Sequence, residues 1–315
     1  MAGTPALADT VHFVGRVCLL DQRTVTKHLL DALPSRLRCI SDGETDKRCN
    51  FVISQGDVFN DSPFVKGPFP PGSSSKPPDI LSGPDAPLVQ LLPLEYDDYA
   101  ISGYREFCTL RAEGVIPMGV HFQISLPTPV NVLDSLVEPA WRAIVEPLYK
   151  RALLAALRHI QDHIPAGDLA EGALQRVFRF AAAVDEGVAL RFHLCYGDLG
   201  HKHFVEPKDT AVLVEIANAI LKGTTRPVDW IHLPVPKSRV DLGYFSPLTQ
   251  LQLSSTKLYL GLLHPDDEGT RERIKAAAGF VGAFRLATYC GLGRSSLAEL
   301  DSILGIGKRV KGPHL

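Results

Sequence analysis

Residues 188–196 read Val-Ala-Leu-Arg-Phe-His-Leu-Cys-Tyr, a short apolar run that contains one imidazole and one thiol. Helices are predicted on both sides of it, at residues 171–184 and from the cap Asp209 to residue 222, where Gly223 ends the second helix. Short apolar strands bracketed by helices are typical of parallel sheets built from βα units. This stretch therefore predicts an α/β fold.

The same pattern recurs along the chain. Six further strands are predicted, at residues 11–17, 37–40, 115–126, 228–233, 257–264 and 284–289. Helices are predicted between them at residues 24–33, 97–113, 132–164 and 270–284, and a last helix opens with the capping box Ser296-Leu297-Ala298-Glu299. Seven predicted strands alternating with helices indicate a repeated βα architecture.

Polar residues gather where these strands end. They are Asp42 and Glu44, His193 and Cys195, His232, His264 and Cys290. In a (β/α)8 TIM barrel the carboxyl ends of the strands form one mouth, where active sites are built. A doubly wound open sheet would need a phosphate-binding glycine turn after its first strand, and residues 14–17 (Val-Gly-Arg-Val) are no GxGxxG motif. The pattern favours a TIM-barrel-like fold.

The length of 315 residues allows two ordinary domains or one barrel. Residues 56–87 contain eight prolines and four glycines, which interrupt any periodic pattern. Only about 55 residues precede this stretch, too few for a comfortable α/β domain. We therefore expect a single barrel domain over residues 1–315 with an irregular insertion at 56–87.

Composition limits the kind of protein. The 33 basic and 35 acidic residues give a net charge of −2, which does not favour nucleic acid or an anionic membrane. No apolar run approaches the roughly 20 residues of a membrane span, and the N-terminus lacks the features of a signal peptide. The six cysteines are scattered without a CxxC pair, so a disulfide framework is not expected. We expect a cytoplasmic enzyme that acts on a small molecule; the oligomeric state stays open.

A metal site is predicted at the carboxyl ends of the strands. His193 and Cys195 are two residues apart on a strand, so both side chains point to the same face. His232 adds a second imidazole and Cys290 a second thiol. Two thiolates with one or two imidazoles suit zinc in tetrahedral geometry. Spacing alone leaves an alternative open, in which a buried cysteine lies beside a hydrogen-bonded histidine without metal.

Five landmarks in order suggest a family. They are Asp42-Gly43-Glu44, Leu126-Pro127-Thr128-Pro129, His193-Leu194-Cys195-Tyr196-Gly197-Asp198, His264-Pro265 and Cys290-Gly291-Leu292-Gly293-Arg294. With them the chain resembles the catalytic C-terminal barrel of cobalamin-independent methionine synthase, in the superfamily that also contains uroporphyrinogen decarboxylase. Within that superfamily it looks most like a single-barrel branch. The resemblance runs from about residue 13 to residue 310.

The resemblance implies a set of roles. His193, Cys195 and Cys290 correspond to zinc ligands, and His232 lies nearest the position of the fourth ligand, a glutamate in the synthase. In the synthase the zinc holds a substrate thiolate, which takes a methyl group from a folate. The implied cofactors are thus zinc and a folate or other methyl donor.

Further residues follow from the same resemblance. Glu44 aligns with a carboxylate that contacts the amino-acid substrate, and His264 aligns with a proposed general acid. Asp42 and Asp198 stand in the matching motifs and are expected, with Glu44, to bind substrate. Arg16 stands where the synthase has a serine in its substrate loop, and an arginine suits a carboxylate or phosphate on a different substrate.

Two other departures concern the fold and the mouth. Tyr289 precedes the cysteine where the related branch usually has a glutamate. The related proteins also continue after Ala170 with a fourth strand that carries an aspartate, whereas here Ala170 runs directly into Glu171. We therefore predict a barrel in which the fourth strand is missing, either because the printed chain omits a segment or because the barrel is altered and open.

The leading hypothesis is a zinc-dependent enzyme that acts on a small thiol or related metabolite, most simply by methyl transfer to a zinc-bound thiolate. The first alternative is a lyase, decarboxylase or isomerase of specialised metabolism that uses Arg16 and His264 at the same mouth. The second is a degenerate, non-catalytic barrel that binds a small ligand or a partner subunit.

Overall fold

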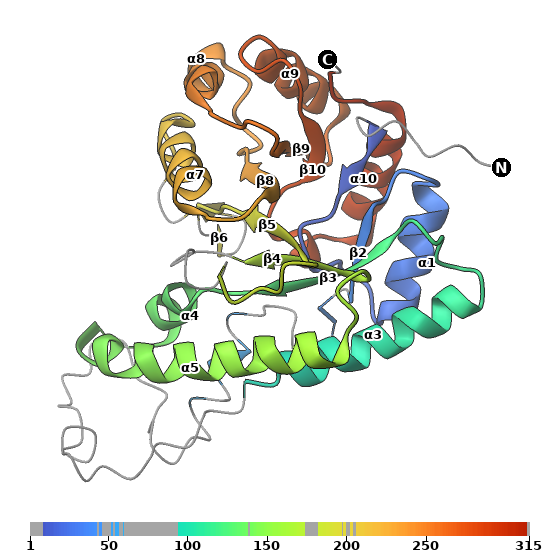
Figure 1. The fold of residues 1–315 in the computed structure, drawn as a ribbon. Coiled ribbons are helices and arrows are strands. Elements are labelled where there is room, and N and C mark those ends of the chain that lie inside the picture. The colour runs from blue at the N-terminus through green and yellow to red at the C-terminus, as the bar shows by residue number, and fades with distance from the viewer. Residues whose placement is uncertain are drawn as a thin grey trace, which may run out of the picture.

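The computed structural model describes residues 9–42, 44–45, 52, 54–56, 59, 94–137, 139–173, 182–196, 198–199, 202–203 and 206–313. Its centre is a curled parallel sheet with helices on the outside (Figure 1). The strands are β1 (Val11–His12), β2 (Cys39–Ser41), β3 (His121–Leu126), β4 (Leu169–Ala173), β5 (Ala189–His193), β8 (Val228–Pro234), β9 (Lys257–Leu263) and β10 (Arg285–Thr288).

The strand order is that of a TIM barrel opened at one seam. Eight strands pair in the order β1-β10-β9-β8-β5-β4-β3-β2. Within this sheet, strands that follow one another along the chain are neighbours, as in a TIM barrel, except for β1 and β2. Among the described residues no ladder joins β1 to β2; one backbone bond, from Val11 N–H to the Arg36 carbonyl at 2.9 Å, crosses this seam. The fold is therefore a partial TIM-barrel-like α/β fold and not a complete barrel.

The prediction of a missing fourth strand is wrong. Residues 169–173 form β4, which pairs in parallel with β3 on one side and with β5 on the other. The sequence Leu-Ala-Glu-Gly-Ala has no β-branched or aromatic residue, so its strand propensity is low, and the hydrogen bonds of two flanking strands impose the conformation. The predicted helix at 171–184 is accordingly wrong over residues 171–173, which are a strand, and over residues 182–184, which form a turn; residues 174–181 lie outside the described part.

Except for the short helix Leu242–Phe245, which was not predicted, the helices follow the predicted pattern with adjusted ends. They are α1 (Gln22–Ala32), α3 (Tyr96–Ala112), α4 (Pro129–Leu136), α5 (Pro139–His163), α7 (Ala211–Gly223), α8 (Leu242–Phe245), α9 (Asp267–Ala278) and α10 (Leu297–Arg309). The long helix predicted at 132–164 is two helices, because Val137 adopts an extended conformation between α4 and α5. The predicted capping box of Ser296 and Glu299 is present at the start of α10.

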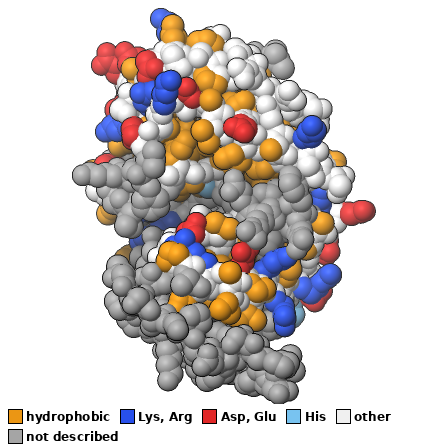
Figure 2. Space-filling view, turned by 90° about the vertical axis from the view of Figure 1, so that its left-hand side faces the viewer, with side chains coloured by type: hydrophobic (Ala, Val, Ile, Leu, Met, Phe, Trp, Pro, Cys, Tyr) orange, Lys and Arg blue, Asp and Glu red, His pale blue; other side chains and the backbone are white. Residues whose placement is uncertain are grey.

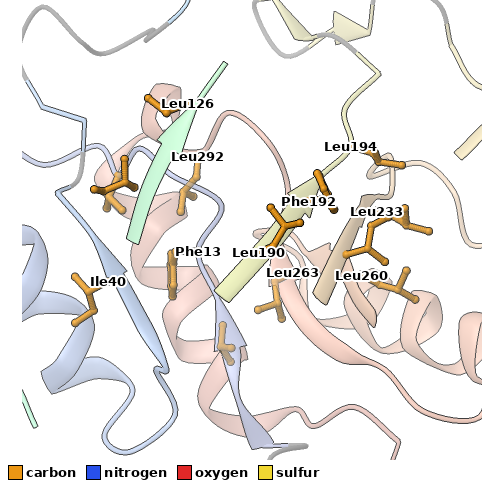
Figure 3. Close-up of a cluster of buried hydrophobic side chains, with 14 of the residues drawn as sticks. Phe13, Ile40, Leu126, Leu190, Phe192, Leu194, Leu233, Leu260, Leu263 and Leu292 are labelled. Atoms are coloured by element: carbon orange, nitrogen blue, oxygen red, sulfur yellow. The ribbon is translucent and has the colours of Figure 1, made fainter. Parts of the chain in front are cut away.

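The two faces of the sheet carry different side chains. Leu190 and Phe192 of β5 pack with Leu233 of β8 and Leu260 of β9 in the main apolar core (Figure 3). The alternate residues of the same strands point to the concave side. There Trp230 of β8 contacts His12 of β1 with ring centroids 4.5 Å apart, although β9 and β10 lie between those strands in the sheet. The apolar side chains of the outer face thus pack in the core beneath the helices, whereas the inner face carries polar and aromatic groups.

Other predictions concern the chain as a whole. The insertion predicted at 56–87 lies outside the described residues except for Gly56 and Phe59, and the single-domain assignment stays a prediction. No helix in the described part has both the length and the apolar character that a membrane span needs. In the coloured part of the face in Figure 2, acidic and basic side chains are interspersed with hydrophobic ones.

Candidate metal centre

Three predicted ligands come together at the carboxyl ends of the strands. His193 is the last residue of β5, Cys195 follows it by two positions, and Cys290 follows the end of β10 by two. One ring nitrogen and the two Sγ atoms all lie within 4.8 Å of one another. Because β8 and β9 separate β5 from β10 in the sheet, the curl of the sheet is what brings the second thiol to the first two groups.

Local backbone geometry sets the position of Cys290. Gly291 has a φ of 95°, a left-handed conformation that favours glycine. This residue turns the chain directly from Cys290 into the short 3-10 helix Leu292–Arg294. The backbone therefore leaves the direction of β10 directly after Cys290, and the thiol lies at the carboxyl end of the strand.

The imidazole of His193 is engaged on one side and available on the other. Its Nδ1 lies 2.7 Å from Nδ1 of His232, and its Nε2 is buried without a hydrogen-bond partner among the described residues. Because Nδ1 is engaged with His232, the buried Nε2 is the ring nitrogen left to bind a metal together with the two thiols. Two sulfur ligands and one nitrogen ligand suit zinc, and three protein ligands leave a fourth position for a substrate or water. The residues present therefore fit the metal that the sequence predicts.

His232, predicted as a further ligand, does not join this group of three. Its side chain is fully buried, and its ring packs against the ring of His193 with centroids 4.7 Å apart. Burial lowers the pKa of His232 well below its ordinary value, and the nearby His193 and His12 lower it further. His232 is thus a neutral neighbour of the candidate ligand His193.

His12 also lies in this region, and the sequence reasoning did not single it out. Its ring lies 6.4 Å from that of His232, and burial, with Arg191 and His193 nearby, lowers its pKa to about 3. Its Nε2 is buried and has no partner among the described residues. The alternation of polar Thr10 and His12 around apolar Val11 is the signal that could have found it.

Glu44 and Asp42 lie in one buried turn after β2. The backbone N–H of Glu44 donates to Asp42 Oδ1 at 3.1 Å, and Glu44 has a φ of 44°. The carboxylate of Glu44 lies over Gly15, where an added Cβ would be 2.9 Å from Oε1. Asp42 therefore shapes the turn, and Glu44 reaches across to the loop after β1. Substrate contact by either residue stays a prediction.

Arg16 connects the loop after β1 with the segment that carries Cys290. Its aliphatic carbons lie directly over Gly293, in the space that a Cβ of that residue would fill. The structure thus places Arg16 beside the Cys-Gly-Leu-Gly segment. Asp198 lies in the short strand β6 (Asp198–Leu199), which pairs with β7 (Lys202–His203), and its side chain lies outside the described part.

His264 has the surroundings of a packed residue. Its Nε2 lies 2.9 Å from the Val235 carbonyl, and its ring stacks on Tyr289 with centroids 4.8 Å apart. Burial, with a smaller effect of Arg273, lowers the pKa of His264 to about 3, so the ring is neutral at pH 7. A neutral ring that donates to a backbone carbonyl is poorly suited to protonate a leaving group. The general-acid role remains a prediction that these contacts disfavour.

The site and the sheet together define an α/β protein with a histidine and two cysteines at the carboxyl ends of parallel strands. No family model and no curated protein matches the chain.

Solved structures do match it in part. A B12-independent methionine synthase from Shewanella sp. W3-18-1, in complex with selenomethionine, is 16% identical with a TM-score of 0.46, over 68% of this chain and 65% of that chain. A candidate vitamin-B12-independent methionine synthase from Listeria monocytogenes is 13% identical with a TM-score of 0.44, over 90% of this chain and 84% of that chain. At this level of similarity neither structure carries an argument about activity.

Proposed function

We propose that this protein is a zinc-dependent enzyme that acts on a small thiol or a related metabolite, most simply by methyl transfer to a thiolate. The convergence of His193, Cys195 and Cys290 within 4.8 Å carries this proposal. Bound zinc would hold a substrate thiol as a thiolate near neutral pH. The sequence landmarks of the methionine synthase family support the same reaction.

Each residue near the mouth has a part in this proposal. His193, Cys195 and Cys290 bind the metal and leave one position open for the substrate sulfur. Glu44, held across Gly15, contacts an ammonium group of the substrate. Arg16, which lies over Gly293, contacts an anionic group such as a carboxylate or phosphate. The substrate that fits these groups is a small zwitterionic or anionic thiol, with a folate or a simpler molecule as methyl donor.

Metal analysis tests the proposal first. The purified protein is expected to hold zinc near one equivalent, and Cys195→Ser and Cys290→Ser are each expected to lose it. Cys108→Ser is the matched control, because Cys108 is exposed and lies on α3, away from this cluster. A folded wild-type protein that takes up no zinc would contradict the proposal and favour a metal-free lyase, decarboxylase or isomerase, or a non-catalytic barrel.

Activity assays then test the reaction. Methyl transfer to homocysteine is measured with a folate donor and, separately, with simpler methyl donors. Product formation that depends on zinc and disappears in Cys290→Ser supports methyl transfer. Zinc binding without transfer from any donor would retain the metal centre and remove the methyltransferase assignment.

A further inference from the structure

We propose that His232 is a positioning residue that holds His193 in the ring tautomer with a lone pair on Nε2, ready to bind the metal. This inference rests on the proposed function, because it assigns His232 a role toward the same metal centre.

The contact between the two rings requires an ordered proton. The two Nδ1 atoms lie 2.7 Å apart, so one nitrogen donates a hydrogen bond and the other accepts it. If His193 donates, its Nε2 carries a lone pair. If His232 donates, a neutral His193 carries its proton on Nε2 and cannot bind a metal until that proton leaves. The choice between these two arrangements therefore decides whether the site is preorganised.

The surroundings of His232 favour the first arrangement. Its side chain has no exposed surface, so a neutral ring with a single N–H is expected. A Cβ placed on Gly261 would lie 3.1 Å from His232 Nε2 and 3.2 Å from the Thr288 carbonyl oxygen, so both atoms border the same small space. His232 Nε2 has no hydrogen-bond partner among the described residues, but the Thr288 backbone raises the pKa of the ring against the effect of burial, as a nearby acceptor does. Because Nδ1 is engaged with His193, we assign this acceptor to Nε2. A proton on Nε2 leaves Nδ1 of His232 as the acceptor for His193.

The sheet fixes the position of the second ring. His232 pairs with His193 of β5 on one side and with Tyr259 of β9 on the other, so its backbone cannot shift easily. Gly261 lies where the pairing of β9 and β10 is irregular, between Leu286 and Thr288 of β10. Any side chain at Gly261 would meet the ring of His232 and the backbone of Pro234 and Thr288. The glycine thus leaves the space that the ring occupies.

Two substitutions at one position separate positioning from packing. In His232→Asn the amide oxygen lies close to the position of Nδ1 and still accepts from His193. In His232→Leu the volume is kept but the acceptor is lost. We expect zinc affinity within about threefold of wild type for the asparagine variant and a 10–100-fold loss for the leucine variant, the usual cost of removing such a partner. Affinity is measured by competition with a chromophoric zinc chelator, with His121→Asn as the control.

The outcomes are distinct. A role in packing alone predicts that leucine is tolerated at least as well as asparagine, so equal zinc affinity of the leucine variant and wild type would overturn the inference. Equal loss in both variants would overturn it too. A wild-type protein that binds no zinc would instead contradict the proposed function.

A second measurement needs no metal and keeps the inference testable if a variant fails to fold. Two-bond proton–nitrogen NMR spectra of the metal-free protein, labelled with nitrogen-15 in histidine, report which ring nitrogen carries the proton. We expect His193 to be protonated on Nδ1 and His232 on Nε2. The reverse pattern would overturn the inference.

Discussion

On the inner side of the sheet, buried polar groups are paired near the amino ends of the strands, whereas a ring nitrogen near the carboxyl ends has no partner among the described residues. Near the amino ends, Arg191 donates from Nε to Asp229 Oδ2 at 3.1 Å and from Nη1 to Cys39 Sγ at 2.8 Å, and Asp229 also pairs with Lys257. At the carboxyl ends, Nε2 of His193 has no partner among the described residues. Each charge of a buried cluster satisfies its partner, so removing one is costly, whereas an unpartnered buried nitrogen is available to a ligand.

The same strands supply both ends. Residues 191 and 193 of β5 lie on one face, so this strand gives Arg191 to the ion cluster and His193 to the metal centre. In β8 the pairing with β5 shifts between Leu190 and Arg191, which leaves Asp229 as an extra residue. Such a bulge re-aims a side chain. With strict alternation the side chain of Asp229 would point to the face opposite Trp230 and His232. The bulge lets its carboxylate contact Arg191 on the inner face.

The largest effect is expected from breaking the ion cluster. Asp229→Asn removes the charge that pairs with Arg191, whose side chain is only 8% exposed. Leaving that guanidinium without its carboxylate should cost about 3 kcal/mol of unfolding free energy. Urea denaturation of the metal-free protein measures this.

The control is Asp134→Asn, which breaks the exposed pair of Asp134 with Arg142 and should cost less than about 1 kcal/mol. Equal costs for the two variants would show that the amino-end cluster does not stabilise the fold more than a surface pair does.

An intermediate effect is expected from the pH dependence of His264. Its folded pKa of about 3 lies below the ordinary value of 6.5, so between these pH values only the unfolded chain binds the proton. Stability therefore falls as pH drops below 6.5, by up to about 1.4 kcal/mol per pH unit from this group. His264→Gln keeps a donor toward the Val235 carbonyl but does not titrate.

Unfolding free energies of wild type and His264→Gln at pH 7 and pH 5 test this expectation. The difference between the two proteins should change in favour of the variant by about 2 kcal/mol over this interval. Parallel pH profiles would mean that the buried ring is not the source of the acid sensitivity.

The smallest effect is expected at the candidate ligands. Cys290→Ser should change the unfolding free energy of the metal-free protein by less than about 1 kcal/mol, because its thiol is partly exposed and is proposed to serve the metal. The same variant should lose the stabilisation that added zinc gives to wild type. If Cys290→Ser lowered the unfolding free energy of the metal-free protein as much as Asp229→Asn does, the main role of Cys290 would be to stabilise the fold.

Most of the secondary structure could be predicted from local sequence. The capping box at Ser296 and the apolar strands at 228–234 and 257–263 carry strong signals, and the structure confirms them. Strand β4 could not be found, since its small residues give a weak signal and its conformation depends on β3 and β5. The split between α4 and α5 was missed because both halves have helical periodicity and only the extended Val137 separates them.

The candidate site shows the same division. The pair His193 and Cys195 follows from period-two alternation, which is a local property of any strand. Cys290 could be proposed only from the resemblance and from its place at a strand end, since 95 positions separate it from Cys195. That His232 contacts His193 and does not join the thiols depends on the pairing of neighbouring strands. His12 lies in the same interior but comes from β1.

The repeated βα pattern, the polar residues at the strand ends and the soft ligands of the candidate site follow from the sequence, because alternation and side-chain chemistry are local. Long-range pairing was needed to show that β4 completes the run of eight strands and that no ladder joins β1 to β2 in the described part of the chain. It was also needed to show that His232 contacts His193 and does not join the two thiols. These features depend on strand register, sheet curvature and the bulges at Asp229 and Gly261, which arise only when strands distant in the sequence pair.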